Sequence, residues 1–155
     1  SMIDHRNEQV MGHILTIEDP VEYLYRNKKS LINQREVGSD TASLEVALKN
    51  ALRQAPDVIM IGEIRDRETM SASIAYAQSG HLCLATMHAN NSYHALGRIL
   101  SFYPPESRSS MLSDLAAGLR AVVSQRLLRA NNGGRIAAVA ARGGTAGAAG
   151  VRIGP

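Results

Sequence analysis

Three carboxylates follow an apolar run near the start of the sequence. They are Glu18, Asp19 and Glu22 in the stretch HILTIEDPVEY, residues 13–23, which contains no Lys or Arg. Carboxylates gathered in this way could hold a divalent cation or accept a proton from water. The stretch therefore indicates a cation site, a general base, or both.

Comparable residues follow two later apolar runs. Glu63 and Arg65 come after the run VIMIG, and Thr86 and His88 come at the end of the run LCLAT and just beyond it. A phosphorylated ligand with Mg²⁺ requires carboxylates for the metal, a carboxylate that orients or deprotonates water, and a neutral donor near the transferred phosphate. The three groups of residues together provide those parts.

Two of these acids also fit ordinary structural roles. Glu63 could be a strand-end acid that pairs with Arg65 or Arg67 at the surface. Asp19 precedes a proline, and Asp-Pro commonly begins a turn. The residue types alone leave both alternatives open.

His81, Cys83 and His88 invite a zinc site, but strand geometry argues against it. If residues 81–88 are extended, seven steps of roughly 3.3 Å separate the histidines by about 23 Å and place them on opposite faces. One metal cannot bind both. We expect His88 at the carboxyl edge of a sheet, His81 at the other end in a structural or intersubunit role, and Cys83 packed as a small hydrophobe. Asn90 and Asn91 could equally cap a following helix.

The elements that must position these residues alternate along the chain. Nearly continuous apolar runs predict buried strands at residues 13–17, 58–62 and 82–86. Helical spacing predicts helices at 43–54 and 66–79, the first capped by Asp40-Thr41. This order predicts an α/β fold with a parallel sheet, in which ligands bind outside the carboxyl ends of the strands. The candidate residues should therefore converge at one edge.

The remaining segments are predicted less directly. Residues 24–37 read as an inserted loop or hairpin, and residues 92–101 as a helix. After the break FYPP, apolar spacing predicts one long helix over residues 107–129. We expect three regions: a partial α/β core at 1–104, a helical C-terminal appendage at 105–130, and a Gly/Ala-rich tail at 131–155 that is disordered or out of frame.

Composition limits the class of protein. The 155 residues are 45% hydrophobic and 20% charged, which fits a globular domain. A net charge of +3, one Phe and no Trp give no footprint for nucleic acid. Because no run of about 18 apolar residues and no signal-like start occur, we expect a cytoplasmic protein without direct membrane insertion.

A phosphate-binding loop is missing from the sequence. No string of the form G-x-x-x-x-G-K-S/T occurs, although such a loop supplies backbone amides and a lysine to phosphates. The first dozen residues, SMIDHRNEQVMG, read as the end of a helix and a turn into a buried strand. We therefore expect a strand and a phosphate loop upstream of Ser1.

Several long strings resemble one family. Across roughly residues 2–139 the chain is similar to the carboxyl-terminal ATPase domain of the type IV pilus retraction motors, the PilT and PilU family within the hexameric secretion ATPases. The resemblance is to PilU above all. The matching strings are HILTIEDPVEY, LINQREVGSDT, ALKNALRQAPDVIMIGEIRDRET, SGHLCLATMHANN and LRAVVSQRLLR.

The resemblance implies a RecA-like fold and a role for each candidate residue. TIEDPVEY resembles the family's aspartate box, APDVIMIGEIRD its Walker B segment and SGHLCLATMHANN its histidine box. Glu63 would then orient Mg²⁺ and its water, Glu22 would be the general base, and His81 and His88 would be the histidine-box pair. The implied nucleotide-binding residues are Glu18, Asp19, Arg65 and Thr86.

The resemblance also implies cofactors, partners and a place in the cell. These are ATP and Mg²⁺, a homo-hexamer or a mixed assembly with a sibling retraction ATPase, and a pilus platform protein at the inner membrane. The motor would power pilus retraction and twitching motility from the cytoplasmic side. The alternative is a non-catalytic subunit that packs with a sibling ATPase, because the phosphate loop is missing; the 155 residues alone are expected to be inactive and to bind no ATP.

The end of the chain departs from the family. Where the family continues as RIAAVEV into further helices, this sequence reads RIAAVAARGGTAGAAG. We hypothesise a change of reading frame or an assembly error near Val139, which the encoding DNA would reveal.

Overall fold

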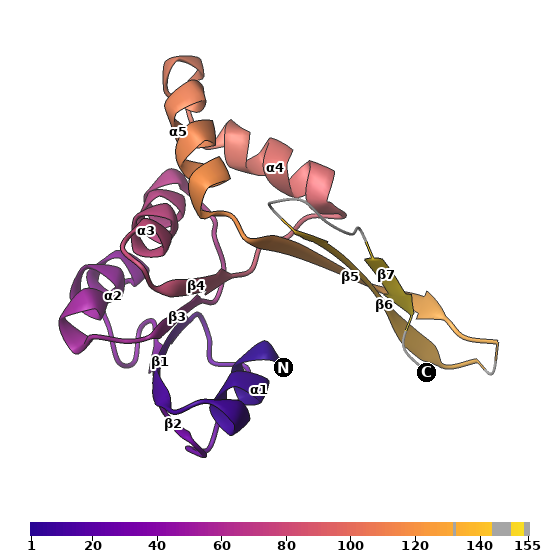
Figure 1. Ribbon diagram of the computed structural model, residues 1–155, viewed down its shortest axis with the longest axis horizontal. Helices are drawn as coiled ribbons and strands as arrows, with labels where there is room; N and C mark the ends of the chain where they lie inside the picture. The colour runs from indigo at the N-terminus through magenta and orange to yellow at the C-terminus, as the bar shows by residue number, and fades with distance from the viewer. Residues whose placement is uncertain (132, 144–149, 154–155) are drawn as a thin grey trace. The chain divides into compact units, whose positions relative to one another are not determined.

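The computed structural model describes residues 1–131, 133–143 and 150–153. These form two compact units, residues 1–87 and residues 88–155 (Figure 1). The first unit contains a four-stranded sheet and the second a three-stranded sheet. The division falls after residue 87, whereas the sequence predicted a core that runs to residue 104.

The sheet of the first unit is parallel, as predicted. Its strands are β1 (Gly12–Glu18), β2 (Ser30–Glu36), β3 (Val58–Ile61) and β4 (Leu82–Ala85), in the spatial order β2-β1-β3-β4. All three neighbouring pairs are parallel. The two central strands carry the continuous apolar runs because both of their faces are covered. The predicted α/β class is therefore confirmed.

Strand β2 was not predicted. It lies inside residues 24–37, which read as a loop or hairpin, yet it pairs with β1 over its full length. The strand is polar because it lies at the edge of the sheet, and only Ser30 and Ile32 among its residues are buried. A half-polar edge strand lacks the continuous apolar run by which the other three were recognised.

Helices cover both faces of this sheet. One hydrophobic cluster joins β1 and β3 to α2 (Leu44–Ala51) and α3 (Arg67–Gln78), while the second joins the other face to α1 (Met2–Gln9). A short 3-10 turn, η1 (Leu52–Gln54), follows α2. The cap of α2 is Ser43, whose side chain accepts from Val46 N, and not the predicted Asp40-Thr41 pair. Asp66 caps α3.

Cys83 packs partly buried against the first cluster. Burial raises the pKa of its thiol to about 11, so the thiol stays protonated near neutral pH. This agrees with the expectation of an unreactive cysteine.

The second unit differs from its prediction after Gly118. Its elements are α4 (Ser92–Ser101), α5 (Pro105–Gly118), β5 (Ala121–Arg129), β6 (Arg135–Gly143) and β7 (Gly150–Ile153). The single helix predicted for residues 107–129 is therefore wrong in its second half, because residues 121–129 pair antiparallel with β6 along their whole length. Residues 135–143 of the expected tail form that partner strand. Residues 150–153 of that tail form β7, which pairs antiparallel with β6. For residues 132, 144–149 and 154–155, the prediction of disorder falls outside the described residues.

No helix in the described part of the chain has both the length and the apolar composition to span a membrane.

Candidate active site

The carboxyl edge of the parallel sheet brings three strand ends level with one another. Ile17 of β1 pairs with Ile61 of β3, and Ile61 pairs with Ala85 of β4. The next residues continue the ladder, because Gly62 N donates to Ile17 O at 2.8 Å and Thr86 N donates to Ile61 O at 3.3 Å. The turns that leave β1, β3 and β4 therefore start at the same edge, as the sequence predicted.

Gly62 allows the β1 and β3 turns to approach closely. A Cβ atom at this position would lie 3.1 Å from Cα of Glu18 and 3.2 Å from the carbonyl oxygen of Ile17. Both neighbours are main-chain atoms within the sheet, so neither can move aside. The glycine therefore brings the residues that follow β3 next to those that follow β1.

Arg65 joins two carboxylates at this edge. Its Nε lies 2.7 Å from Oε2 of Glu63, and its Nη1 lies 3.2 Å from Oδ2 of Asp19. The hydrogen bond that Arg65 donates to Glu63, with a smaller contribution from Asp19, raises the pKa of Arg65. The alternative left open by the sequence, a pair between Glu63 and Arg65, is therefore present, and it also includes Asp19.

The two carboxylates meet the chemical requirement for a cation site. The Glu63 side chain is only 17% exposed, while Asp19 and Arg65 are more than half exposed. Two acids from different strand ends thus already share one positive group. Among the described residues no group of three or more His, Cys, Asp or Glu could hold a metal alone. Carboxylates in this number suit Mg²⁺, which usually binds one or two protein carboxylates together with phosphate oxygens and water.

Thr86 holds the turn that carries Glu63. Its hydroxyl donates to the carbonyl of Gly62, and its carbonyl accepts from Ile64 N at 2.9 Å. The Thr86 side chain is therefore bonded to the main chain, and its predicted contact with nucleotide stays a prediction.

Glu18 and Glu22 lie in opposite environments although both were predicted beside the ligand. Glu18 is 6% exposed, and its Oε1 accepts from the Thr16 hydroxyl at 2.6 Å and from Gln34 Nε2 at 3.2 Å. Glu22 is exposed and contacts no polar partner within the described ranges. Glu18 is thus buried and already hydrogen-bonded, whereas Glu22 is exposed, and the predicted roles of both residues at the nucleotide stay predictions.

His81 lies at the amino end of β4, the edge opposite to Glu63. Its Nδ1 is 3.0 Å from Ser79 Oγ, and its ring contacts Tyr76 edge-on at a centroid distance of 6.4 Å. This agrees with the sequence argument that His81 and the carboxyl edge are separated. Its predicted role across a subunit boundary stays a prediction.

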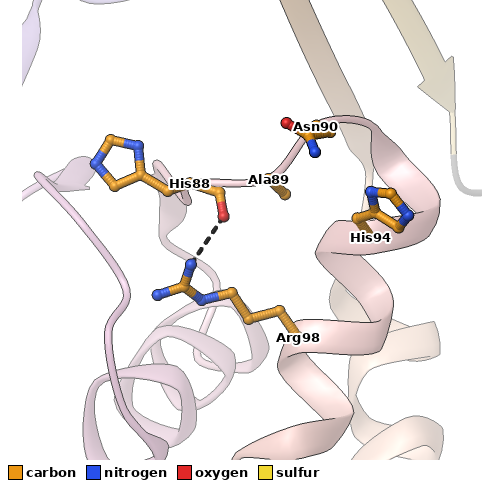
Figure 2. A pocket seen from close by; sticks show the side chains of 5 residues that line it. All are labelled: His88, Ala89, Asn90, His94 and Arg98. Atoms are coloured by element: carbon orange, nitrogen blue, oxygen red, sulfur yellow. Dashed lines mark hydrogen bonds between the residues drawn. The ribbon is translucent and has the colours of Figure 1, made fainter.

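His88 begins the second unit and lines a cavity of about 400 Å³ with Ala89, Asn90, His94 and Arg98 (Figure 2). Arg98 Nη1 donates to the His88 carbonyl at 3.0 Å. Figure 2 shows the His88 ring extending away from His94. The imidazole is exposed, so it is accessible to a ligand.

The next residues of this segment are also fixed. Arg126 Nε of β5 donates to Asn90 O at 3.0 Å. Asn91 caps α4 by accepting from His94 N at 2.9 Å, which confirms the capping alternative for this residue. The two arginines were not singled out by sequence because their contacts are to main-chain carbonyls, which no side-chain pattern reports.

The chain was compared with known proteins. Residues 1–148 match the family model described as "Type II/IV secretion system protein". The type IV pilus ATPase PilU of Pseudomonas aeruginosa is 53% identical over 133 residues, which are 86% of this chain and 35% of that protein. The retraction ATPase PilT of the same organism is 41% identical over 138 residues, 89% of this chain and 40% of that protein.

A solved structure shares the fold. The crystal structure of the pilus retraction motor PilT with bound ADP superposes with a TM-score of 0.85 and 45% identity, covering 90% of this chain and 40% of that one. The chain therefore spans about two fifths or less of the length of these relatives. Since the family model covers nearly the whole chain, the chain belongs to the type II/IV secretion system protein family.

Proposed function

We propose that the chain is part of an ATP-hydrolysing motor that powers retraction of type IV pili and twitching motility. The observation that carries this proposal is the pair of carboxylates, Asp19 and Glu63, which both bind the guanidinium group of Arg65 at the carboxyl edge of the sheet. Family membership supports it, as do the similar retraction ATPases and the ADP bound to the solved PilT motor.

In this proposal Mg²⁺ replaces the Arg65 guanidinium at the two carboxylates. Glu63, with Asp19 beside it, would hold or orient Mg²⁺ and its water, and the metal would neutralise phosphate charge there. Arg65, which occupies the carboxylates in the free chain, would then be released toward the nucleotide. Its proposed role is binding of phosphate.

The other predicted site residues would transfer the proton, contact the transferred phosphate or support the site. Glu22, whose side chain is exposed, would accept the proton of the attacking water as general base. His88 would donate to the transferred phosphate, and Thr86 would line the site. His81 would act across a subunit boundary. For Glu18 we propose support of the site in place of nucleotide contact, because its carboxylate is buried.

The assembly is proposed by likeness to the relatives. The motor would be a homo-hexamer or a mixed hexamer with a sibling retraction ATPase. It would work in the cytoplasm, bound to a platform protein of the pilus machinery at the inner membrane, without nucleic acid.

The test is turnover of the full-length protein that carries this chain. Glu63→Ala and Glu22→Ala should each lower turnover by about 100-fold or more, the range for loss of a general base or a metal-orienting acid. Glu45→Ala is the matched control, since Glu45 is exposed and pairs with Lys49 on the surface of α2. Near-normal turnover in either site variant would remove that residue from its role.

A second function is favoured by one feature of the sequence. Because no G-x-x-x-x-G-K-S/T string occurs in the 155 residues, the chain by itself could act as a packing module for a sibling ATPase. We propose that the isolated chain binds no MgATP. Calorimetry that detects binding at micromolar nucleotide would contradict this.

A further inference from the structure

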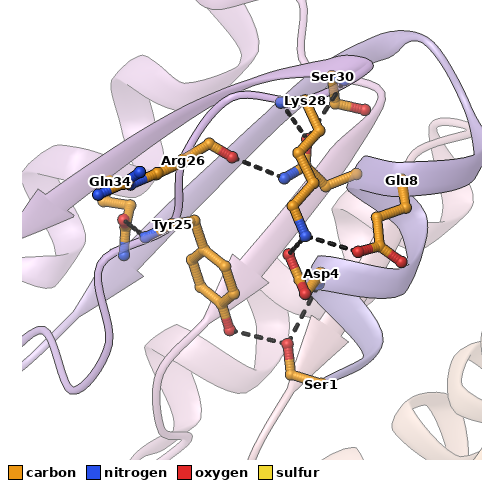
Figure 3. A network of polar contacts seen from close by, with 9 residues as sticks. Ser1, Asp4, Glu8, Tyr25, Arg26, Lys28, Ser30 and Gln34 are labelled. Carbon is orange, nitrogen blue, oxygen red and sulfur yellow. Dashed lines mark hydrogen bonds and ion pairs between the residues drawn. The ribbon is translucent and has the colours of Figure 1, made fainter.

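Strand β2 holds the loop that carries Glu22. Here the Glu22 segment means residues 21–25. Gln34 Nε2 donates to Tyr23 O at 2.8 Å. Gln34 Oε1 accepts from Tyr25 N at 2.8 Å (Figure 3). On the other side of Glu22, Oε2 of Glu36 accepts from Val21 N at 2.9 Å. Gln34 and Glu36 are two residues apart on β2 and therefore share one face of the strand.

The orientation of the Gln34 amide is set by a buried carboxylate. Besides Tyr23 O, its Nε2 donates to Oε1 of Glu18 at 3.2 Å. Glu18 is 6% exposed and also accepts from Thr16, which is fully buried. The NH₂ group must face these acceptors, so the amide oxygen must face Tyr25 N. All three bonds of the amide are thus satisfied in one orientation.

The side chain of Glu22 contributes nothing to its own placement. It is exposed and makes no hydrogen bond or ion pair in the part of the chain that the structure describes. Its position therefore depends on the main chain at Val21, Tyr23 and Tyr25, which the β2 side chains hold.

We propose that Gln34 is a positioning residue for Glu22, oriented by the buried pair of Thr16 and Glu18. This inference rests on the proposed function, because the consequence for hydrolysis requires Glu22 to be the general base. It also gives the buried Glu18 a role in the site without contact with nucleotide.

The test compares the same chemical change at neighbouring residues. Gln34→Glu turns the donor that faces Glu18 and Tyr23 O into an acceptor. Asn33→Asp is the matched control, because Asn33 is exposed, lies on the other face of β2, and has its amide bonded to His13 Nε2. Gln34→Met, which adds no charge, serves as a second variant should Gln34→Glu unfold.

Three kinds of measurement are made on the full-length protein: steady-state kinetics for ATP (kcat and KM), thermal unfolding, and amide hydrogen exchange at Tyr25. We expect the Gln34 variants to lower kcat by about 10- to 100-fold with KM changed less than about twofold, because a misplaced base costs rate more than binding. Exchange at Tyr25 should become faster. Asn33→Asp should keep wild-type values of all three.

A double-mutant cycle separates positioning from a general structural role. If Gln34 acts through Glu22, then Gln34→Met should lower kcat little further in a Glu22→Ala background. Unchanged kcat in the Gln34 variants, or losses that multiply fully with Glu22→Ala, would overturn the inference. Full activity of Glu22→Ala would overturn the proposed base itself, and exchange at Tyr25 would still decide whether Gln34 holds the segment.

Discussion

The segment that carries Glu22 and the segment that carries His88 are held in different ways. Neutral and acidic side chains of β2 hold residues 21–25, and a carboxylate with 6% exposure fixes their orientation. Two exposed guanidinium groups, Arg98 and Arg126, hold residues 88–90 through main-chain carbonyls. One loop is thus fixed by partly buried side chains of an edge strand that are backed by a buried carboxylate, and the other loop is fixed by exposed side chains.

This difference predicts different responses to solvent and mutation. A hydrogen bond in the interior is costly to remove, because its partner is left unsatisfied away from water. A bond from an exposed arginine competes with water and is screened by salt. The partly buried arrangement suits a residue that must stay in one place for proton transfer. The surface arrangement suits a residue that responds to a ligand.

The largest expected effect is a difference in kcat between a substitution in the Glu22 segment and one at His88. Glu22→Gln removes the proposed general base and should lower kcat by about 10²- to 10⁴-fold, whereas His88→Asn keeps a neutral donor and should lower kcat less. Steady-state hydrolysis by the full-length protein measures both. A larger loss for His88→Asn would exchange the two roles.

The second effect concerns stability of the interior network. Thr16→Val removes the hydroxyl that donates to the buried Glu18 carboxylate and should lower the free energy of unfolding by roughly 1.5–3 kcal/mol. Thr41→Val is the control, because the Thr41 hydroxyl donates to a neutral carbonyl, that of Ser43, at 3.1 Å on a partly exposed residue. Chemical denaturation measures both. Equal losses would show that the hydrogen bond to the buried Glu18 carboxylate stabilises the fold no more than the hydrogen bond of Thr41.

The sequence predicted the site best where apolar residues run continuously along a strand. The apolar runs of β1, β3 and β4 located the strand ends, and these in turn placed Asp19, Glu63 and Thr86 at one edge. Local chemistry also predicted the Asn91 cap. These features depend on a few consecutive residues, so they can be read without knowledge of the fold.

The parts that were missed depend on partners far along the chain. The polar residues of β2 include Gln34 and Glu36, which bond to the main chain of the Glu22 segment. Because β2 was not predicted as a strand, the sequence could not show that these two side chains share one face. Strand β5 has apolar residues at spacings that fit a helix. It is nevertheless a strand, because residues 121–129 pair with β6. The role of Glu18 followed only from its burial.

The third effect should distinguish the segments by salt. Arg98→Met and Arg126→Met should speed amide exchange near residues 88–91 while costing at most about 1 kcal/mol of stability, since both guanidinium groups are exposed. In the wild type, 1 M salt should speed exchange there but leave Tyr25 unchanged, because its acceptor is a neutral amide. Hydrogen exchange with and without salt measures this. Equal salt sensitivity at both segments would remove the contrast between them.

The smallest effect tests an exposed ion pair beside the Glu22 segment. Lys28 lies 2.8 Å from Asp4 and 2.6 Å from Glu8 of α1 (Figure 3). The hydrogen bonds that Lys28 donates to Asp4 and then to Glu8 raise the pKa of Lys28 from 10.5 to about 12, and the hydrogen bond with Lys28 lowers the pKa of Asp4 from 3.8.

The sign of the pH dependence follows from both shifts. A raised lysine pKa stabilises the fold below 10.5, and this is lost as the pH rises through about 12. A lowered aspartate pKa stabilises it above 3.8, and this is lost as the pH falls. Lys28→Met should therefore lower the Tm slightly at pH 7, with the difference shrinking toward both extremes. A Tm difference that stays constant from acid to alkali would show that Lys28 stabilises the fold through the packing of its aliphatic stem. Its ion pairs with Asp4 and Glu8 would then contribute nothing to stability beside the Glu22 segment.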